Sequence, residues 1–174
     1  MNKDGSRAVL GMLGLQQPQC MNKLAFKEGV GALFAEAGFK RKGAVWGRTG
    51  TDVVVVFRMT KSDLAQTFYL DFGLHLGSVD GTSYPSVHRC EINGRIDGLF
   101  REQRSLIAEA CMLERAEQLF PDLLDFLRSA ALPFLLDCMS MGRVRDHYLD
   151  GRFSGVLVSK TAKDKLAVFA RHGA

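Results

Sequence analysis

The stretch TFYLDFGLHL, residues 67–76, has the clearest alternating pattern in this chain of 174 residues. The apolar residues at its even positions are Phe68, Leu70, Phe72, Leu74 and Leu76, and between them lie Thr67, Tyr69, Asp71, Gly73 and His75. A period of two places one set on each face of a β-strand. We therefore expect a strand with one face in the core and a polar second face.

Similar signals extend outward from this stretch. We predict four strands, at about 42–48, 51–60, 66–77 and 85–93, joined by the short connections TG, KSD and GSVDGTSYP. Short connections favour antiparallel neighbours. The run VVVVF at residues 53–57 is apolar at every position, as expected for a central strand with partial cover on each face.

Helical patterns flank the predicted strands. Apolar residues at helical spacing predict a helix over 22–37, which Gly38 would end. After Gly98 the pattern is helical again, with a break expected at Pro133 and two shorter helices at 140–149 and 161–171, the last opened by the capping pattern TAKD. This order predicts an α+β fold in which the N-terminal helix packs on a four-stranded antiparallel sheet and C-terminal helices complete the core. We expect these side chains to be buried: Phe26, Val30, Phe34, Val55, Phe57, Phe68, Leu70, Phe72 and Leu74.

Composition indicates one globular domain, residues 21–174, after a tail at 1–20. Apolar residues make up 47% and charged residues 24% of the chain, and the net charge of +4 permits an anionic partner without requiring one. The four cysteines lie far apart, which argues against a disulfide framework or a zinc site and favours free thiols in the cytoplasm. No apolar run is long enough to span a membrane, and the N-terminus lacks a signal-peptide pattern. We expect no metal and no cofactor.

The polar face of the third predicted strand provides the first candidate site. It carries Tyr69, Asp71 and His75, to which the fourth strand would add Arg89 and Glu91. The other register would instead bring in His88 and Cys90. Three catalytic arrangements stay open: a thiolate pair of Cys90 with a histidine, a metal site of His75, His88 and Asp71, and an acid/base pair of Asp71 with Glu91. Cross-strand ion pairing on a solvated sheet is the more common outcome for such residues.

The segment before the second predicted strand provides another candidate. Its basic and aromatic residues are Lys40, Arg41, Lys42, Trp46 and Arg48. An indole ring among cations can bind nucleic acid or another anion. The same cations can instead stabilise the end of the first helix, with Trp46 covering the edge of the core. We favour this structural role.

Three segments, GFKRKGAVWGR, FYLDFGLHL and HRCEINGRI, occur in an order and spacing that resemble the bacterial family filed as domain of unknown function 4304. The resemblance covers residues 22–135. It implies a cytoplasmic accessory or interaction domain and brings no catalytic residues with it.

Our first functional hypothesis is a non-enzymatic binding domain. Its polar sheet face, with Tyr69, Asp71, His75, Arg89 and Glu91, would contact a protein or a small polar ligand. The second hypothesis is a nucleic-acid contact through the basic segment at 40–48. The third is a small enzyme that uses His75 or His88 with Cys90.

Overall fold

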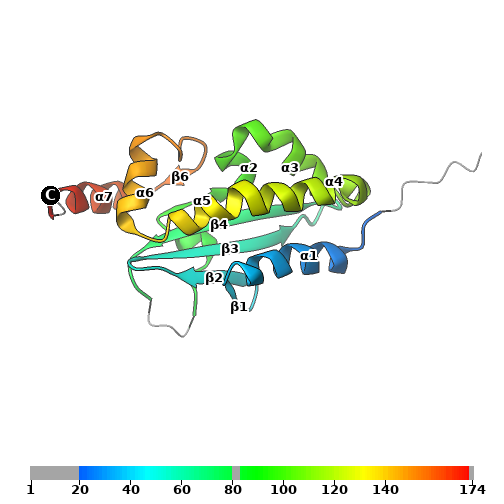
Figure 1. Ribbon diagram of the computed structural model, residues 1–174, viewed down its shortest axis with the longest axis horizontal. Coiled ribbons are helices and arrows are strands. Elements are labelled where there is room, and N and C mark those ends of the chain that lie inside the picture. Colours follow the sequence, from blue (N-terminus) through cyan, green and yellow to red (C-terminus); the bar gives the residue numbers. More distant parts are fainter. Residues whose placement is uncertain (1–19, 80–82, 173–174) are drawn as a thin grey trace, which may run out of the picture.

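A six-stranded antiparallel sheet forms the centre of the computed structural model, which describes residues 20–79 and 83–172 (Figure 1). The strands, which neighbour one another in chain order, are β1 (Lys40–Lys42), β2 (Val45–Thr49), β3 (Val53–Lys61), β4 (Phe68–Leu76), β5 (Ile92–Arg95) and β6 (Leu157–Val158). The α+β class and the antiparallel pairing are confirmed. The predicted tail at 1–20 lies, except for Cys20, outside the described residues.

The predicted count of four strands is wrong. The two edge strands β1 and β6 have only three and two residues, too few to give an alternating pattern. The predicted strand at 85–93 is also wrong over most of its length. Residues Val87–Arg89 form the 3-10 helix η1, and pairing with β4 begins only at Ile92.

One helix precedes the sheet, η1 lies between β4 and β5, and the other helices follow β5. Besides η1, they are α1 (Lys23–Glu36), α2 (Ile96–Leu99), the 3-10 helix η2 (Arg101–Gln103), α3 (Arg104–Ala110), α4 (Leu113–Phe126), the π-helical turn η3 (Leu127–Ala131), α5 (Leu132–Asp137), α6 (Met141–Leu149) and α7 (Lys160–His172). The first helix therefore forms where its apolar spacing predicts.

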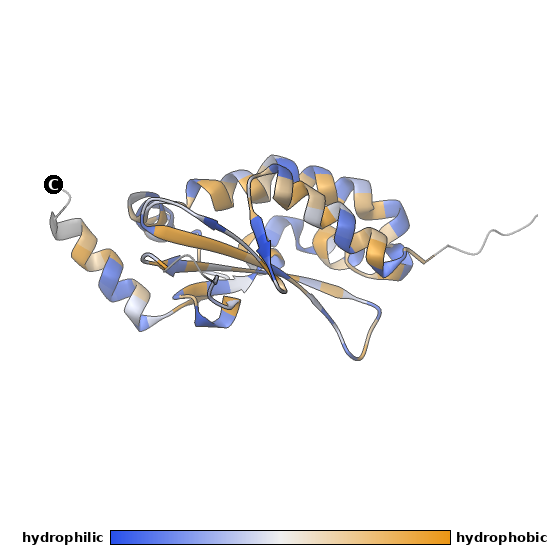
Figure 2. Cartoon of the chain, turned by 90° about the horizontal axis from the view of Figure 1, so that it is seen from below, coloured by the Kyte–Doolittle hydropathy of each residue, from blue (hydrophilic) through white to orange (hydrophobic). Residues whose placement is uncertain are grey.

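The main core lies between the helices and one face of the sheet. All nine side chains that we expected to be buried are at most 2% exposed. Phe34 stacks on Phe57, with ring centroids 3.7 Å apart, and Phe26 stacks on Phe68 at 4.8 Å. Hydrophobic residues recur along these helices and along the long central strands in Figure 2. Burial of apolar surface is the dominant favourable term in folding, and these stacked rings belong to the core that provides it.

One residue of the basic segment at 40–48 stabilises the end of α1. Asn22 caps the start of this helix, and Gly38, with φ of 82°, provides the left-handed residue after its end. The Arg48 guanidinium donates a hydrogen bond to the carbonyl of Ala37, the C-cap residue. The cation that serves the helix end is thus Arg48, whereas Lys40 lies in the exposed strand β1.

Two predictions about the C-terminal helices have different outcomes: the break at Pro133 is confirmed, and the cap at residues 161–164 is wrong. Pro133 lies at the start of α5, directly after the π-helical turn η3, so the helical segment is divided near the expected position. The TAKD cap is wrong, because α7 begins earlier. Its first-turn amide of Ala162 donates to the Ser159 hydroxyl over 3.1 Å.

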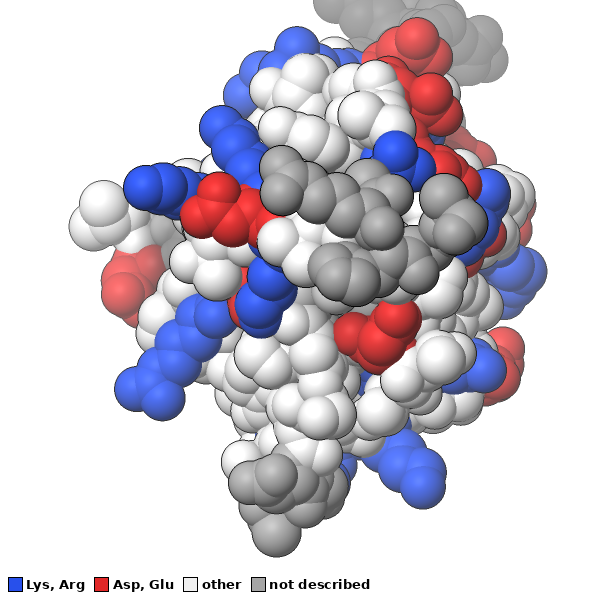
Figure 3. All heavy atoms as spheres, turned by 90° about the vertical axis from the view of Figure 1, so that its left-hand side faces the viewer, with Lys and Arg blue, Asp and Glu red and all other residues white. Residues whose placement is uncertain are grey.

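Helix α7 and the beginning of α1 lie at opposite ends of the molecule (Figure 1). The face at this end carries interspersed acidic and basic side chains rather than a patch of one sign (Figure 3). Within residues 20–79 and 83–172, no helix is long and apolar enough to cross a membrane.

Candidate functional site

The second face of the sheet, which we call the loop face, is organised by strand register. Directly paired residues share a face, so one row crosses five strands. This row consists of Lys42, Val45, Arg58, Asp71 and Arg95. Thr60 and Tyr69 form a shorter pair beyond it in β3 and β4. The row therefore brings three cations and one carboxylate onto one surface.

The middle of the loop face is covered. Val54 and Val56 of β3 are fully buried in a small second core beneath η1 and its flanking residues. Cys90 closes over Gly73, where an added Cβ would lie 2.7 Å from the Cys90 sulfur. This contact explains the glycine inside β4, and it confirms the expectation that VVVVF has cover on each face. The covered middle separates two polar clusters.

The first cluster, which we call the polar strip, consists of Arg58, Thr60, Tyr69, Asp71 and Arg95. The Asp71 carboxylate accepts a hydrogen bond of 2.6 Å from the Thr60 hydroxyl and one of 3.1 Å from the Arg58 guanidinium. Its side chain is 14% exposed. Both hydrogen bonds fix the carboxylate in place, so Asp71 is already partnered without a ligand.

Arg95 differs from Arg58 in its contacts. Its guanidinium carbon lies 3.8 Å from the centroid of the Tyr69 ring, in cation–π geometry. The Arg95 side chain is exposed, and within the described residues it donates no hydrogen bond and forms no ion pair. Its N–H donors are therefore oriented by an aromatic ring and available to an anion.

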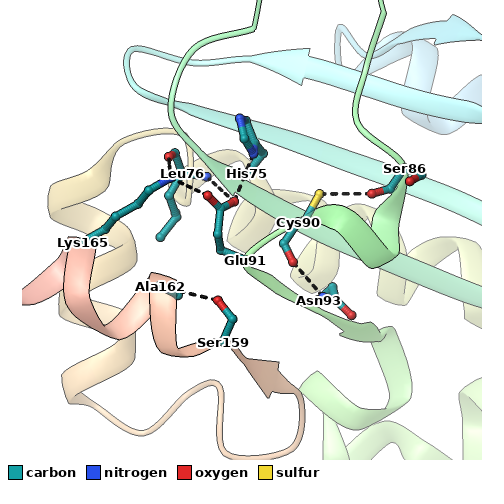
Figure 4. Close-up of polar contacts among 9 residues, drawn as sticks. All are labelled: His75, Leu76, Ser86, Cys90, Glu91, Asn93, Ser159, Ala162 and Lys165. Atoms are coloured by element: carbon teal, nitrogen blue, oxygen red, sulfur yellow. Dashed lines mark hydrogen bonds and ion pairs between the residues drawn. The ribbon is translucent and has the colours of Figure 1, made fainter.

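The second cluster joins α7 to the sheet (Figure 4). Glu91 contacts the His75 Nδ1 atom at 3.0 Å, accepts a 3.1 Å hydrogen bond from the Leu76 amide, and pairs with the Lys165 ammonium. Burial alone would raise the pKa of Glu91, but the Lys165 and Leu76 hydrogen bonds and the charge of His75 hold this pKa below its ordinary value. We call this cluster of His75, Leu76, Glu91 and Lys165 the clasp, because it joins segments that are distant in the sequence.

The five predicted ligand-binding residues therefore do not form one site. Tyr69 and Asp71 lie in the polar strip, whereas His75 and Glu91 lie in the clasp. Arg89 belongs to η1 and Glu91 precedes β5. The prediction that one strand carries both residues is therefore wrong. Arg89 is exposed and contributes to neither cluster.

The catalytic arrangements receive no geometric support. Burial raises the pKa of the Cys90 thiol to about 12, and its sulfur donates to the Ser86 carbonyl at 3.6 Å, so the thiol is protonated at neutral pH. His88 is exposed and contacts the Ser86 hydroxyl at 3.3 Å. Asp71 and Glu91 belong to different clusters. In the described part of the chain, no three His, Cys, Asp or Glu side chains converge on a possible metal position.

The basic segment at 40–48 is divided by the sheet. The register places Lys40 and Lys42 on the loop face, whereas Arg41 pairs with Trp46 on the helix face, 5.9 Å from the ring. The indole packs against α1, where a Cβ on Gly31 would lie 2.9 Å from the ring. With Arg48 at the helix end, these residues do not form a single anion-binding surface.

Sequence reasoning missed Arg58, Thr60, Arg95 and Lys165. The first three reach the polar strip only through the strand register, and Lys165 reaches Glu91 across 74 positions of the chain. No local pattern signals either arrangement.

No family model matches the chain, and neither a curated protein nor a solved structure was found to be similar to it. The resemblance to domain of unknown function 4304 therefore stays a prediction.

Proposed function

We propose that this protein is a non-enzymatic binding domain whose polar strip receives an acidic segment of a partner protein. The observation that carries the proposal is the Arg95 guanidinium, which stacks on Tyr69 and makes no other polar contact within the described residues. Aromatic rings and arginines are the side chains that most often dominate protein interfaces.

Charge supports an acidic partner. The carboxylate of Asp71 pairs with Arg58 at 3.1 Å, whereas Arg95 of the same row forms no ion pair within the described residues. Opposite charges across an interface speed association and exclude wrong partners. A pair of fixed hydrogen bonds on Asp71 also keeps the strip ordered before binding, which lowers the entropy cost of association.

A selection from a displayed library of random peptides tests the proposal. We expect the wild-type protein to enrich acidic peptides, and the charge reversal Arg95→Glu to lose them. The matched control is Arg115→Glu, because Arg115 is also exposed but lies on α4 and pairs with Glu109 at 2.7 Å. Enriched peptides that bind the Arg95→Glu variant as well as the wild type would contradict the proposal.

A further inference from the structure

A notch beside the polar strip arises from the unequal lengths of two paired strands. β5 ends at Arg95, opposite Asp71, whereas β4 extends back to Phe68. The neighbouring segment rejoins β4 only at the bridge between Thr67 and Met112. Helix α3 lies alongside the interval, and the space between has a volume of about 380 Å³. This volume is at the lower end of the range for ligand pockets, roughly 300 to 1,000 Å³.

The floor of the notch is apolar. It is lined by Phe68, Leu70, Ile107, Ala108 and Cys111. Burial raises the pKa of the Cys111 thiol to about 12, so this side chain is neutral and presents no charge to a ligand. Such a floor suits a compact hydrocarbon group, whose transfer from water is favourable.

The rim of the notch is cationic. Arg95 and Arg104 line it together with Tyr69 and Asp97. The Arg104 Nε atom lies 3.8 Å from the Asp97 carboxylate, too far for a hydrogen bond, and the Arg104 side chain is 72% exposed. The two guanidinium groups and the one carboxylate leave a single positive charge. The rim therefore complements a monoanion better than a dianion.

We propose that the notch binds a small apolar group that carries one carboxylate, with the carboxylate on Arg95 and Arg104 and the apolar body on the floor at Leu70 and Ile107. The proposal rests on the proposed function, since both use Arg95 and Tyr69. Such a carboxylate can belong to a free organic acid or to the C-terminal residue of the partner segment. Planar guanidinium groups match the two oxygens of either one.

Calorimetric titrations of the full chain with three matched probes test the chemistry. We expect saturable binding of phenylacetate, and binding weaker by about tenfold or more for phenylacetamide, which lacks the charge, and for acetate, which lacks the apolar body. Phenyl phosphate, a dianion at neutral pH, should also bind more weakly than phenylacetate. Equal binding of phenylacetate and phenylacetamide would overturn the role of the arginines.

Variants locate the binding. Arg95→Gln and Arg104→Gln should each weaken phenylacetate binding, by about tenfold for a lost charge-assisted hydrogen bond. Ala108→Leu should fill the notch and abolish binding with an unchanged melting temperature. Arg115→Gln, on α4 outside the notch, is the control that should bind normally. Binding that survives Ala108→Leu would overturn the proposal, as would no detectable binding at about 10 mM phenylacetate.

A second pair of probes distinguishes the two sources. Acetyl-glycyl-phenylalanine carries a peptide C-terminus, and its C-terminal amide removes the charge. Tighter binding of this peptide acid than of phenylacetate assigns the notch to a partner's C-terminal residue, and the reverse order assigns it to a free acid. If acidic peptides depend on Arg95 but phenylacetate does not bind, the notch proposal fails while the proposed function stands. If only phenylacetate binds, the proposed function fails.

Discussion

The Arg95 guanidinium lies over the Tyr69 ring at 3.8 Å from its centroid, although the two residues are diagonal rather than direct partners in the pairing of β4 with β5. Diagonal neighbours across antiparallel strands are within reach of long and aromatic side chains. The contact orients an exposed cation at the boundary between the polar strip and the notch. The free energy of this contact between Arg95 and Tyr69 can be measured.

We predict that a double-mutant cycle of Tyr69→Leu and Arg95→Met gives a coupling free energy of about 0.5 to 1 kcal/mol in favour of the folded state. Urea denaturation of the four proteins measures it. Replacement of each side chain by an apolar one of similar length preserves most of the packing. A coupling indistinguishable from zero would show that the stacked geometry is not populated in solution.

Trp46 should be a structural residue. The ring is half-buried against Gly31 of α1, and we predict that Trp46→Ala lowers the free energy of unfolding by about 2 to 3 kcal/mol. Lys40→Ala, at an exposed position of β1, should change it by less than about 0.5 kcal/mol. A Trp46→Ala protein as stable as the wild type, combined with salt-sensitive binding of single-stranded RNA by the wild type, would favour the nucleic-acid hypothesis instead.

The clasp of Glu91 and Lys165 should stabilise the fold in a pH-dependent way. Because the pKa of Glu91 is depressed in the folded state, its contribution is fully present above the unfolded value of about 4.5 and is lost as the pH falls through the lower folded value. We predict that Glu91→Gln destabilises the protein at pH 7 by about 1 to 3 kcal/mol. The difference from wild type should shrink steadily below about pH 4.5.

Lys165→Met is the matched variant for this clasp. Its coupling with Glu91→Gln, measured by denaturant unfolding, should be favourable at pH 7 and vanish in acid, where protonated Glu91 no longer attracts the ammonium. A coupling that is equally large at both pH values would mean that packing, not charge, joins α7 to the sheet.

Thiol reactivity separates the binding and enzyme hypotheses. Cys90, Cys111 and Cys138 are buried, and burial raises the pKa of each thiol to about 12, whereas Cys20 is exposed. We predict that iodoacetamide at pH 8 modifies the folded protein only at Cys20, and modifies all four cysteines in denaturant. Peptide mass spectrometry provides the measurement. Rapid modification of Cys90 in the folded protein would restore the thiolate-enzyme hypothesis.

The long strands and α1 could be predicted because each has a periodic pattern of its own. The alternation over residues 67–76 determines which side chains of β4 enter the core, and the helical spacing of Phe26, Val30 and Phe34 does the same for α1. The edge strands β1 and β6 could not be predicted, since such short strands form only by pairing with neighbours that are already in place.

The candidate site was only half predictable for a similar reason. Tyr69 and Asp71 follow from the alternation within one strand, but the partners of Asp71 depend on register, which the sequence leaves open. The segment that contains Cys90 belongs to the predicted strand at 85–93. It instead folds over Gly73 and divides the polar face, a tertiary contact that overrides local propensity.

The most direct test of the central claim is an amide NMR titration of the isotopically labelled protein with an acidic peptide obtained from the displayed library. If the polar strip is the binding surface, the largest shift changes occur at Thr60, Tyr69, Asp71 and Arg95, and His75 and Lys165 of the clasp stay unchanged. The largest changes at β1 and Trp46, or at α7, would contradict the account and move the binding surface to the basic segment or to the clasp.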